Sequence, residues 1–211
     1  MSDTTEDVET SNVMIERAVR ALLAGGAVIY PTETFYGLGA ALESREGVRR
    51  IANIKHRTAP KPLPVIAADR DAAFALFREV TALARRLAER FWPGPLTIVL
   101  PASERVPIEV APQGEIGVRV SSHPVARALA AGAGPLVATS ANLAGAGEQT
   151  RVELLPAEVL TRVDAVVAAG ETPGGSPSTV LRIVDERVEI LREGAIPRAD
   201  LEAVIGAGLI T

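Results

Sequence analysis

The segment AVIYPTETFYGLG, residues 27–39, joins a short apolar run to a polar, glycine-containing run. The apolar part, 27–30, is typical of a buried strand, and the proline after it marks the end of that strand. The polar part, 32–39, is expected as a loop at the strand's carboxyl end, where open α/β sheets bind ligands. Thr32 and Thr34 can each donate and accept hydrogen bonds, which suits a zwitterionic amino acid. A plain capped turn is the alternative for this segment.

Strands and helices alternate along the rest of the chain. Apolar runs predict further strands at residues 63–67, 96–100, 116–120, 136–139, 165–168, 179–184 and 188–191. Helical spacing predicts helices at 15–23, from about 44, around 76–77, at 83–91, from 124, at 156–162 and at 197–205. No linker or repeat interrupts the pattern. We therefore expect one α/β (α+β) domain over residues 11–211, built on a twisted sheet with flanking helices.

The composition is that of an ordinary globular protein, with 47% apolar and 23% charged residues in 211. The absence of cysteine excludes disulfides and thiolate metal sites. No apolar run approaches the roughly 18 residues of a membrane span. Residues 1–10 lack the basic and apolar parts of a targeting sequence, so a cytoplasmic location is expected.

The net charge of −4 is confined to the N-terminus. Residues 1–10 carry four acidic and no basic residues and are expected as a disordered tail. Of the 26 acidic residues, 22 then remain for the rest of the chain, against 22 basic ones. A protein that depends on non-specific nucleic-acid affinity should have a basic domain, so a small ligand fits this chain better.

Several common site motifs are absent. There is no Walker-type phosphate loop, no dinucleotide-binding glycine motif after a strand, and no Gly-x-Ser-x-Gly nucleophile motif. Two histidines without cysteine cannot build a His/Cys metal site, so no metal held by protein side chains is expected.

A short basic segment contains both lysines of the chain, Lys55 and Lys61, with Arg57 between them. Lysine is a compact point charge and is not interchangeable with the arginine used elsewhere. A triphosphate would give the segment a reason to curl, through charge-assisted hydrogen bonds. A solvated loop explains the clustering equally well.

Two other strand ends carry polar side chains. Ser140 and Asn142 could read a phosphate or a ribose, although serine and asparagine also favour turns and caps. Arg119 lies in an otherwise apolar strand, where an unpaired buried charge would be expensive. It therefore either meets a substrate carboxylate or points to solvent.

Two weaker signals lie near the end of the chain and one on a helix. Ser178 and Arg192 occur in short polar segments that are more often structural than functional. Arg85, Arg86 and Arg90 lie on the outer face of their predicted helix, which we interpret as a solvated face rather than an RNA-binding patch.

Together, these segments resemble the YrdC-type threonylcarbamoyl-AMP synthase family in its short form. Seven motifs follow in order between about residues 15 and 197: Pro-Thr-Glu-Thr-Phe-Tyr-Gly-Leu-Gly, Lys-His-Arg, Trp-Pro-Gly-Pro-Leu-Thr, Gly-Val-Arg-Val-Ser-Ser-His-Pro, Ala-Thr-Ser-Ala-Asn, Ser-Thr-Val and Leu-Arg-Glu-Gly. The resemblance implies a twisted mixed sheet around a concave, positively lined cavity.

The resemblance also implies a reaction. L-threonine, bicarbonate and ATP would give L-threonylcarbamoyladenylate and pyrophosphate, with Mg²⁺ bound to the ATP phosphates. The product would supply the tRNA threonylcarbamoyl-transfer machinery that makes t6A. Such chemistry needs positioning and charge neutralisation rather than a protein nucleophile. The resemblance gives neither the oligomeric state nor whether tRNA itself contacts this chain.

Site residues follow by position. The resemblance implies catalytic roles for Lys55 and Arg57, ATP contacts for Lys55, Arg57, Lys61, Ser140, Asn142 and Arg192, and threonine contacts for Thr32, Thr34, Arg119 and Ser178. The chain departs from the family where Thr58 and Lys61 replace a proline and an asparagine found in many members. Ile66 stands where long-form members have a histidine, so no base or ligand role is carried over to it.

Two alternative functions stay open. The first is a non-catalytic, RNA-binding YrdC-like paralogue, which the neutral charge of residues 11–211 disfavours. The second is a related carbamoyl-transfer activity, whose domains usually sit in much longer chains with other catalytic modules.

Overall fold

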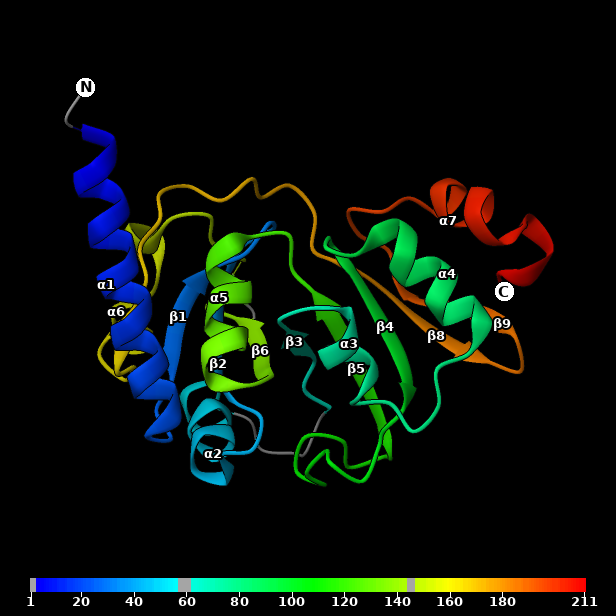
Figure 1. The fold of residues 1–211 in the computed structure, drawn as a ribbon, viewed down its shortest axis with the longest axis horizontal. Helices are drawn as coiled ribbons and strands as arrows, with labels where there is room; N and C mark the ends of the chain where they lie inside the picture. Colours follow the sequence, from blue (N-terminus) through cyan, green and yellow to red (C-terminus); the bar gives the residue numbers. More distant parts are fainter. Residues whose placement is uncertain (1–2, 57–61, 144–146) are drawn as a thin grey trace.

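The structure is a computed structural model that describes residues 3–56, 62–143 and 147–211, with side chains from residue 12 onward. Within them, nine strands form one sheet in the order β7-β1-β2-β6-β3-β5-β4-β8-β9 (Figure 1). The strands are β1 (Val28–Pro31), β2 (Tyr36–Ala41), β3 (Val65–Ala67), β4 (Leu96–Pro101), β5 (Glu115–Val120), β6 (Leu136–Ser140), β7 (Ala165–Val166), β8 (Thr179–Val184) and β9 (Arg187–Arg192). Three pairs are parallel (β1–β7, β3–β5, β4–β8) and the other five are antiparallel, which confirms the mixed α/β sheet.

Strand β2 corrects one sequence-based expectation. The loop expected over 32–39 is wrong in its second half, because the chain from Tyr36 onward pairs with β1 and β6. Gly39 there serves close packing instead of a turn. A Cβ added at Gly39 would lie 2.9 Å from the ring of Tyr30 and 2.7 Å from the carbonyl oxygen of Val137. Glycine is thus required where another strand's side chain lies across the backbone.

Seven α-helices accompany the sheet in the described residues: α1 (Asp3–Leu23), α2 (Arg45–Ile54), α3 (Arg70–Phe74), α4 (Ala82–Phe91), α5 (Pro124–Ala133), α6 (Ala157–Leu160) and α7 (Arg198–Ile205), with 3-10 turns at Val152–Leu154 and Ala207–Leu209. The helix expected around 76–77 is wrong. Asp69 caps α3 further upstream, and Phe77 forms a bridge with Ala102 beside the end of β4. Extended pairing therefore overrides the helical spacing there.

Helix α1 reaches into the N-terminal segment. It begins at Asp3, so it includes most of residues 1–10, which the sequence suggests as a disordered tail. The side chains of residues 1–11 lie outside the description. The division into a tail and a single domain over 11–211 stays a prediction.

Two apolar cores lie on opposite faces of the sheet. In β5, Ile116, Val118 and Val120 belong to the larger core, which includes residues of α2, α3, α4 and α7. The smaller core lies under α1 and α5, which pack side by side (Figure 1). Because side chains alternate along a strand, Gly117 and Arg119 point to the face of the smaller core. That core does not extend beyond β3, so it leaves this face open over β5, β4 and β8.

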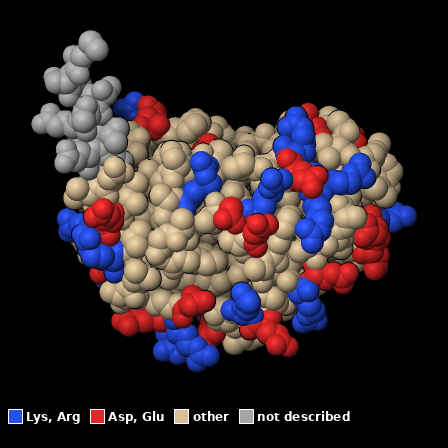
Figure 2. All heavy atoms as spheres, viewed as in Figure 1, with Lys and Arg blue, Asp and Glu red and all other residues tan. Residues whose placement is uncertain are grey.

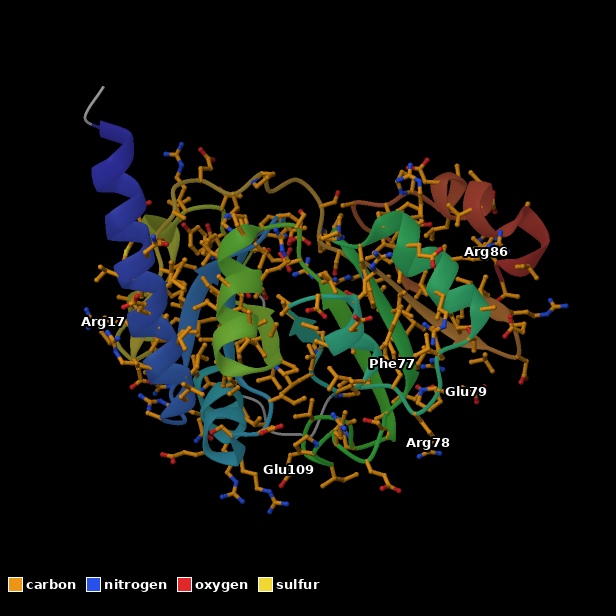
Figure 3. All side chains as sticks on the ribbon, viewed as in Figure 1. Arg17, Phe77, Arg78, Glu79, Arg86 and Glu109 are labelled. Atoms are coloured by element: carbon orange, nitrogen blue, oxygen red, sulfur yellow. The ribbon has the colours of Figure 1, made fainter. Side chains whose placement is uncertain are left out.

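The surface carries mixed charges on the face shown in Figure 2, where acidic and basic side chains are interspersed. The arginines of α4 are engaged in local contacts. Arg86, labelled in Figure 3, donates to the carbonyl of Val204 in α7. Arg85 and Arg90 lie over the rings of Phe74 and Phe91. Within the described residues, no helix combines the length and apolarity that crossing a membrane requires.

Candidate functional site

The open face of the sheet carries two adjoining hollows. The larger, about 320 Å³, lies over β3, β5, β4 and β8, and the smaller, about 240 Å³, lies beside the ends of β2 and β6. Both are lined by Pro64, Ala138, Ser178 and Arg192, so they form one bipartite cavity. A cavity of this combined size lies in the range of small-molecule sites.

Most of the predicted site residues that the structure describes line this cavity. Arg119 lines the larger hollow, Thr32, Thr34 and Ser140 line the smaller one, and Ser178 and Arg192 line both. The two hollows therefore do not separate the residues predicted to bind threonine from those predicted to bind ATP. The predictions for Arg57 and Lys61 fall outside the described residues.

The loop between β1 and β2 brings two threonine hydroxyls to the smaller hollow. Thr32 Oγ1 donates to the carbonyl of Phe35 at 2.7 Å and lies 3.1 Å from Thr34 Oγ1. The carbonyl of Thr34 accepts from Thr172 Oγ1 at 3.0 Å and from the Gly174 amide at 2.8 Å. The loop is thus fixed by its own side chains and by the segment before β8.

Lys55 contacts the segment that follows strand β6. At the end of α2, it is only 7% exposed, and its ammonium donates to the carbonyl of Ser140 at 2.9 Å. It also donates to the carbonyl of Asn142 and, at 3.0 Å, to the Asn142 side-chain oxygen. Ser140 Oγ donates to the same side-chain oxygen at 2.5 Å. Lys55 therefore holds the Ser-x-Asn segment at the end of β6.

Arg119 forms an ion pair with an acidic residue that the sequence analysis did not single out. Its Nη1 lies 2.7 Å from Oε1 of Glu33, and the two side chains are only 11% and 10% exposed. The second oxygen of Glu33 accepts from Ser121 Oγ. Beside this pair, Tyr30 is fully buried and its hydroxyl has no partner among the described residues. Burial raises the pKa of Tyr30, with the charge of Arg119 opposing the shift, so the phenol stays neutral.

Arg192 joins β9 to the start of β8. Its guanidinium donates to the carbonyl of Ser178 at 2.8 and 3.1 Å and to Ser178 Oγ at 2.9 Å, and that hydroxyl lies 3.1 Å from Thr97 Oγ1. Burial lowers the pKa of Arg192, while the charge of Glu148 opposes the shift. An arginine still carries its charge at neutral pH, so the cavity keeps a cation where both hollows meet.

Charges of both signs surround the cavity. Arg119, Arg182 and Arg192 lie among its described lining residues with Glu115 and Glu148, and Glu33 pairs with Arg119 beside them. Arg182 lies 3.4 Å from Glu115, which offsets part of its charge. No three His, Cys, Asp or Glu side chains of the described residues are placed to hold a metal ion.

Comparison with known proteins identifies the family. The model of the Sua5/YciO/YrdC family, described as telomere recombination, matches residues 20–194. The chain belongs to the Sua5/YciO/YrdC family. The match confirms the family resemblance that the ordered motifs of the sequence indicate.

Relatives within the Sua5/YciO/YrdC family have been named for one activity. The chain is 36% identical to the threonylcarbamoyl-AMP synthase of Bacillus subtilis over 97% of its own length and 60% of the relative's. It is 40% identical to the enzyme of the same name from Xanthomonas axonopodis pv. citri, over 82% and 94%. The structure of Pyrococcus abyssi Sua5 complexed with L-threonine superposes with a TM-score of 0.86 at 35% identity, over 93% and 58%. The chain thus spans about three fifths of two of these proteins and nearly all of the third.

The sequence analysis missed two residues at this site. Glu33 lies between the two threonines of the first motif, and Thr97 ends the Trp-Pro-Gly-Pro-Leu-Thr motif. A signal was present for Glu33, because a buried Arg119 requires an acidic partner or ligand. Only the sheet order, however, brings the loop beside β5.

Gly194 is the last residue of the Leu-Arg-Glu-Gly motif, and close packing requires a glycine at this position. A Cβ there would lie 2.3 Å from the carbonyl oxygen of Pro177 and 2.6 Å from backbone atoms of Ser178 and Thr179. Gly194→Ala is therefore expected to lower the free energy of unfolding by about 2–3 kcal/mol and to displace Ser178 from the cavity wall. Urea unfolding measures the loss.

Gly208→Ala is the matched control, because nothing lies within 4 Å of a Cβ at that glycine. It should change the free energy of unfolding by less than about 0.5 kcal/mol. Equal stabilities of the two variants would contradict the close approach at Gly194.

Proposed function

We propose that this protein synthesises L-threonylcarbamoyladenylate from L-threonine, bicarbonate and ATP, releases pyrophosphate, and thereby serves t6A modification of tRNA. The observation that carries the proposal is the bipartite cavity, in which Arg119, Arg192 and Ser178 come together with the threonine hydroxyls of the β1–β2 loop. The names of the relatives and the threonine complex of Pyrococcus abyssi Sua5 support the choice of substrates.

The reaction requires the protein to position its substrates rather than to form a covalent bond with them. The threonine amine condenses with bicarbonate to an N-carboxylate, with loss of one water, and a carboxylate oxygen then attacks the α-phosphorus of ATP as pyrophosphate leaves. Arg119 would bind the threonine carboxylate and Arg192 the nucleotide, each through charge-assisted hydrogen bonds. Holding both substrates in a partly enclosed cavity supplies orientation and limits water access to the labile anhydride.

The roles of the remaining site residues are part of the proposal. Thr32, Thr34 and Ser178 would contact threonine, and Ser140 and Asn142 the nucleotide. For Lys55, the contacts favour a supporting role, since its ammonium holds the Ser140–Asn142 segment. Arg57 and Lys61 are proposed to contact the ATP phosphates.

Magnesium would enter as part of the ATP substrate. The cation would be held mainly by the phosphates, as is usual for Mg²⁺ bound with ATP. We also propose a cytoplasmic location and transfer of the product to the tRNA threonylcarbamoyl-transfer machinery. An enzyme is favoured over the RNA-binding alternative by the neutral net charge of residues 11–211, and the one face seen in Figure 2 mixes both signs of charge.

The reaction is tested by pyrophosphate release. With ATP, Mg²⁺ and bicarbonate, pyrophosphate is expected to rise well above background only when L-threonine is added, because the attacking N-carboxylate forms from the threonine amine. A coupled pyrophosphate assay and mass detection of the adenylate measure it. L-2-aminobutyrate, which differs from L-threonine only in lacking the hydroxyl, is the matched substrate control. Pyrophosphate at background with threonine present would refute the proposed enzyme.

A further inference from the structure

We propose that Glu33 is a positioning residue that aims the guanidinium of Arg119 into the cavity and locks the β1–β2 loop to strand β5. The inference rests on the proposed function, since it concerns how the carboxylate of the amino-acid substrate is received. It assigns a role to the acidic residue between the two threonines.

The geometry of the ion pair determines which donors of Arg119 are engaged. Glu33 accepts from one terminal nitrogen, Nη1, at 2.7 Å, and no other described residue hydrogen-bonds to that guanidinium. Arg119 also lines the larger hollow. A guanidinium carries five N–H donors in a rigid planar fork, so fixing one nitrogen orients the rest. The remaining donors are then available to a carboxylate in the cavity.

Glu33 is itself held from its other oxygen. Ser121 Oγ donates to it, and that serine is fully buried at the junction of β5 and α5. The same Oγ accepts from the His123 amide at 3.2 Å, and Arg127 donates to the Ser121 carbonyl at 2.8 Å. The carboxylate therefore has both oxygens fixed by β5 and by the turn that follows it.

The carboxylate also connects two parts of the cavity. Glu33 lies in the loop between Thr32 and Thr34, whose residues line the smaller hollow, whereas Arg119 lines the larger one. The loop and β5 are 86 residues apart in the chain and do not pair as strands. The Glu33–Arg119 contact therefore fixes the distance between the threonine hydroxyls and the guanidinium. An amino acid that reaches both would depend on that distance.

Because both side chains are buried, the Glu33–Arg119 ion pair is needed to offset the cost of burying either charge. With both side chains about one tenth exposed, an unpaired charge at either position would be costly. Glu33 thus allows Arg119 to stay charged in the cavity before a substrate arrives. A substrate carboxylate would then add to the network without replacing Glu33.

The test is the substrate-specific effect of Glu33→Gln. The variant keeps the size of the side chain and removes its charge. The KM for threonine is expected to rise between about tenfold and a hundredfold, while the KM for ATP changes less than about threefold. Glu33→Asp keeps the charge at shorter reach and should recover part of the loss. An unchanged threonine KM, or an equal rise for both substrates, would overturn the proposal.

A double-mutant cycle shows whether Glu33 acts through Arg119. In the background of Arg119→Gln, adding Glu33→Gln should change the threonine KM by less than about twofold, because the residue to be positioned is gone. A further rise of tenfold or more would mean that Glu33 acts independently, which overturns the proposal. Glu202→Gln, which breaks the exposed Arg198–Glu202 pair of α7, is the matched control and should leave both KM values unchanged.

Two further measurements separate the possible failures. If Glu33→Gln is unfolded at the assay temperature, Ser121→Ala decides, since it frees one oxygen of Glu33 and should raise the threonine KM several-fold; no rise would overturn the proposal. A wild-type protein without threonine-dependent pyrophosphate release would refute the proposed reaction itself. An active wild type with an unaffected Glu33→Gln variant would refute only the positioning role.

Discussion

Replacing Lys55 with methionine is expected to lower kcat/KM for ATP by about 10³-fold. The ammonium of Lys55 donates to two carbonyls and one side-chain oxygen of Ser140 and Asn142, and so fixes the strand end that lines the smaller hollow. Methionine fills similar space but donates no hydrogen bond, so this segment would lose its anchor. Initial rates at varied ATP and saturating threonine measure the effect.

The same substitution should also weaken the fold. Loss of the ammonium removes its hydrogen bonds to the carbonyl of Ser140 and to the oxygens of Asn142, which costs about 2–4 kcal/mol in free energy of unfolding. Urea unfolding measures this loss. Lys55→Arg should not rescue activity, because a planar guanidinium does not fit a cage built for a compact ammonium.

A neighbouring cation provides the control for Lys55. Arg49→Met removes an exposed charge from the same helix, α2, and should leave stability and ATP kinetics nearly unchanged. If Lys55→Met were as stable as Arg49→Met yet lost ATP use, the anchoring role would be contradicted and a direct phosphate contact favoured. If it raised the threonine KM as much as the ATP KM, the assignment to the nucleotide side would be wrong.

Replacing Arg119 with glutamine is expected to raise the threonine KM about a hundredfold and to cost about 3 kcal/mol of stability. The first effect follows from losing the proposed bidentate contact with the substrate carboxylate. The second follows because Glu33 would remain buried and charged without its ion-pair partner. Kinetics at varied threonine and urea unfolding measure the two effects separately.

The double variant distinguishes these two effects. Adding Glu33→Gln to Arg119→Gln removes the unpaired carboxylate, so part of the stability should return while the threonine KM stays high. Glu202→Gln, which breaks the exposed Arg198–Glu202 pair of α7 and leaves the other contact of Arg198 in place, is the control and should change neither. Full stability of the Arg119→Gln single variant would show that the buried pair contributes little, and an unchanged threonine KM would reject the carboxylate contact.

The local sequence was sufficient to predict most of the strands and to identify the family. Strands such as β1, β4 and β8 are continuous apolar or alternating runs, so a short window contains the signal that defines them. The ordered motifs likewise define the Sua5/YciO/YrdC family, because each keeps its residues next to one another. Strand β2 failed this test, since Gly39 is explained only by the ring of Tyr30 and the carbonyl of Val137 on the two neighbouring strands.

The functions of the charged residues depend on tertiary structure instead. Lys55 reaches residues 85 and 87 positions later in the chain, and Arg119 meets a glutamate 86 positions earlier. The sequence predicts that a buried cation needs an anion or an acceptor, but it cannot say which one. That choice is made by the order of the strands, which places the β1–β2 loop, the end of β6 and strand β5 around one cavity. Burial in a low dielectric then makes each contact strong enough to decide which cations face the ligand and which support the fold.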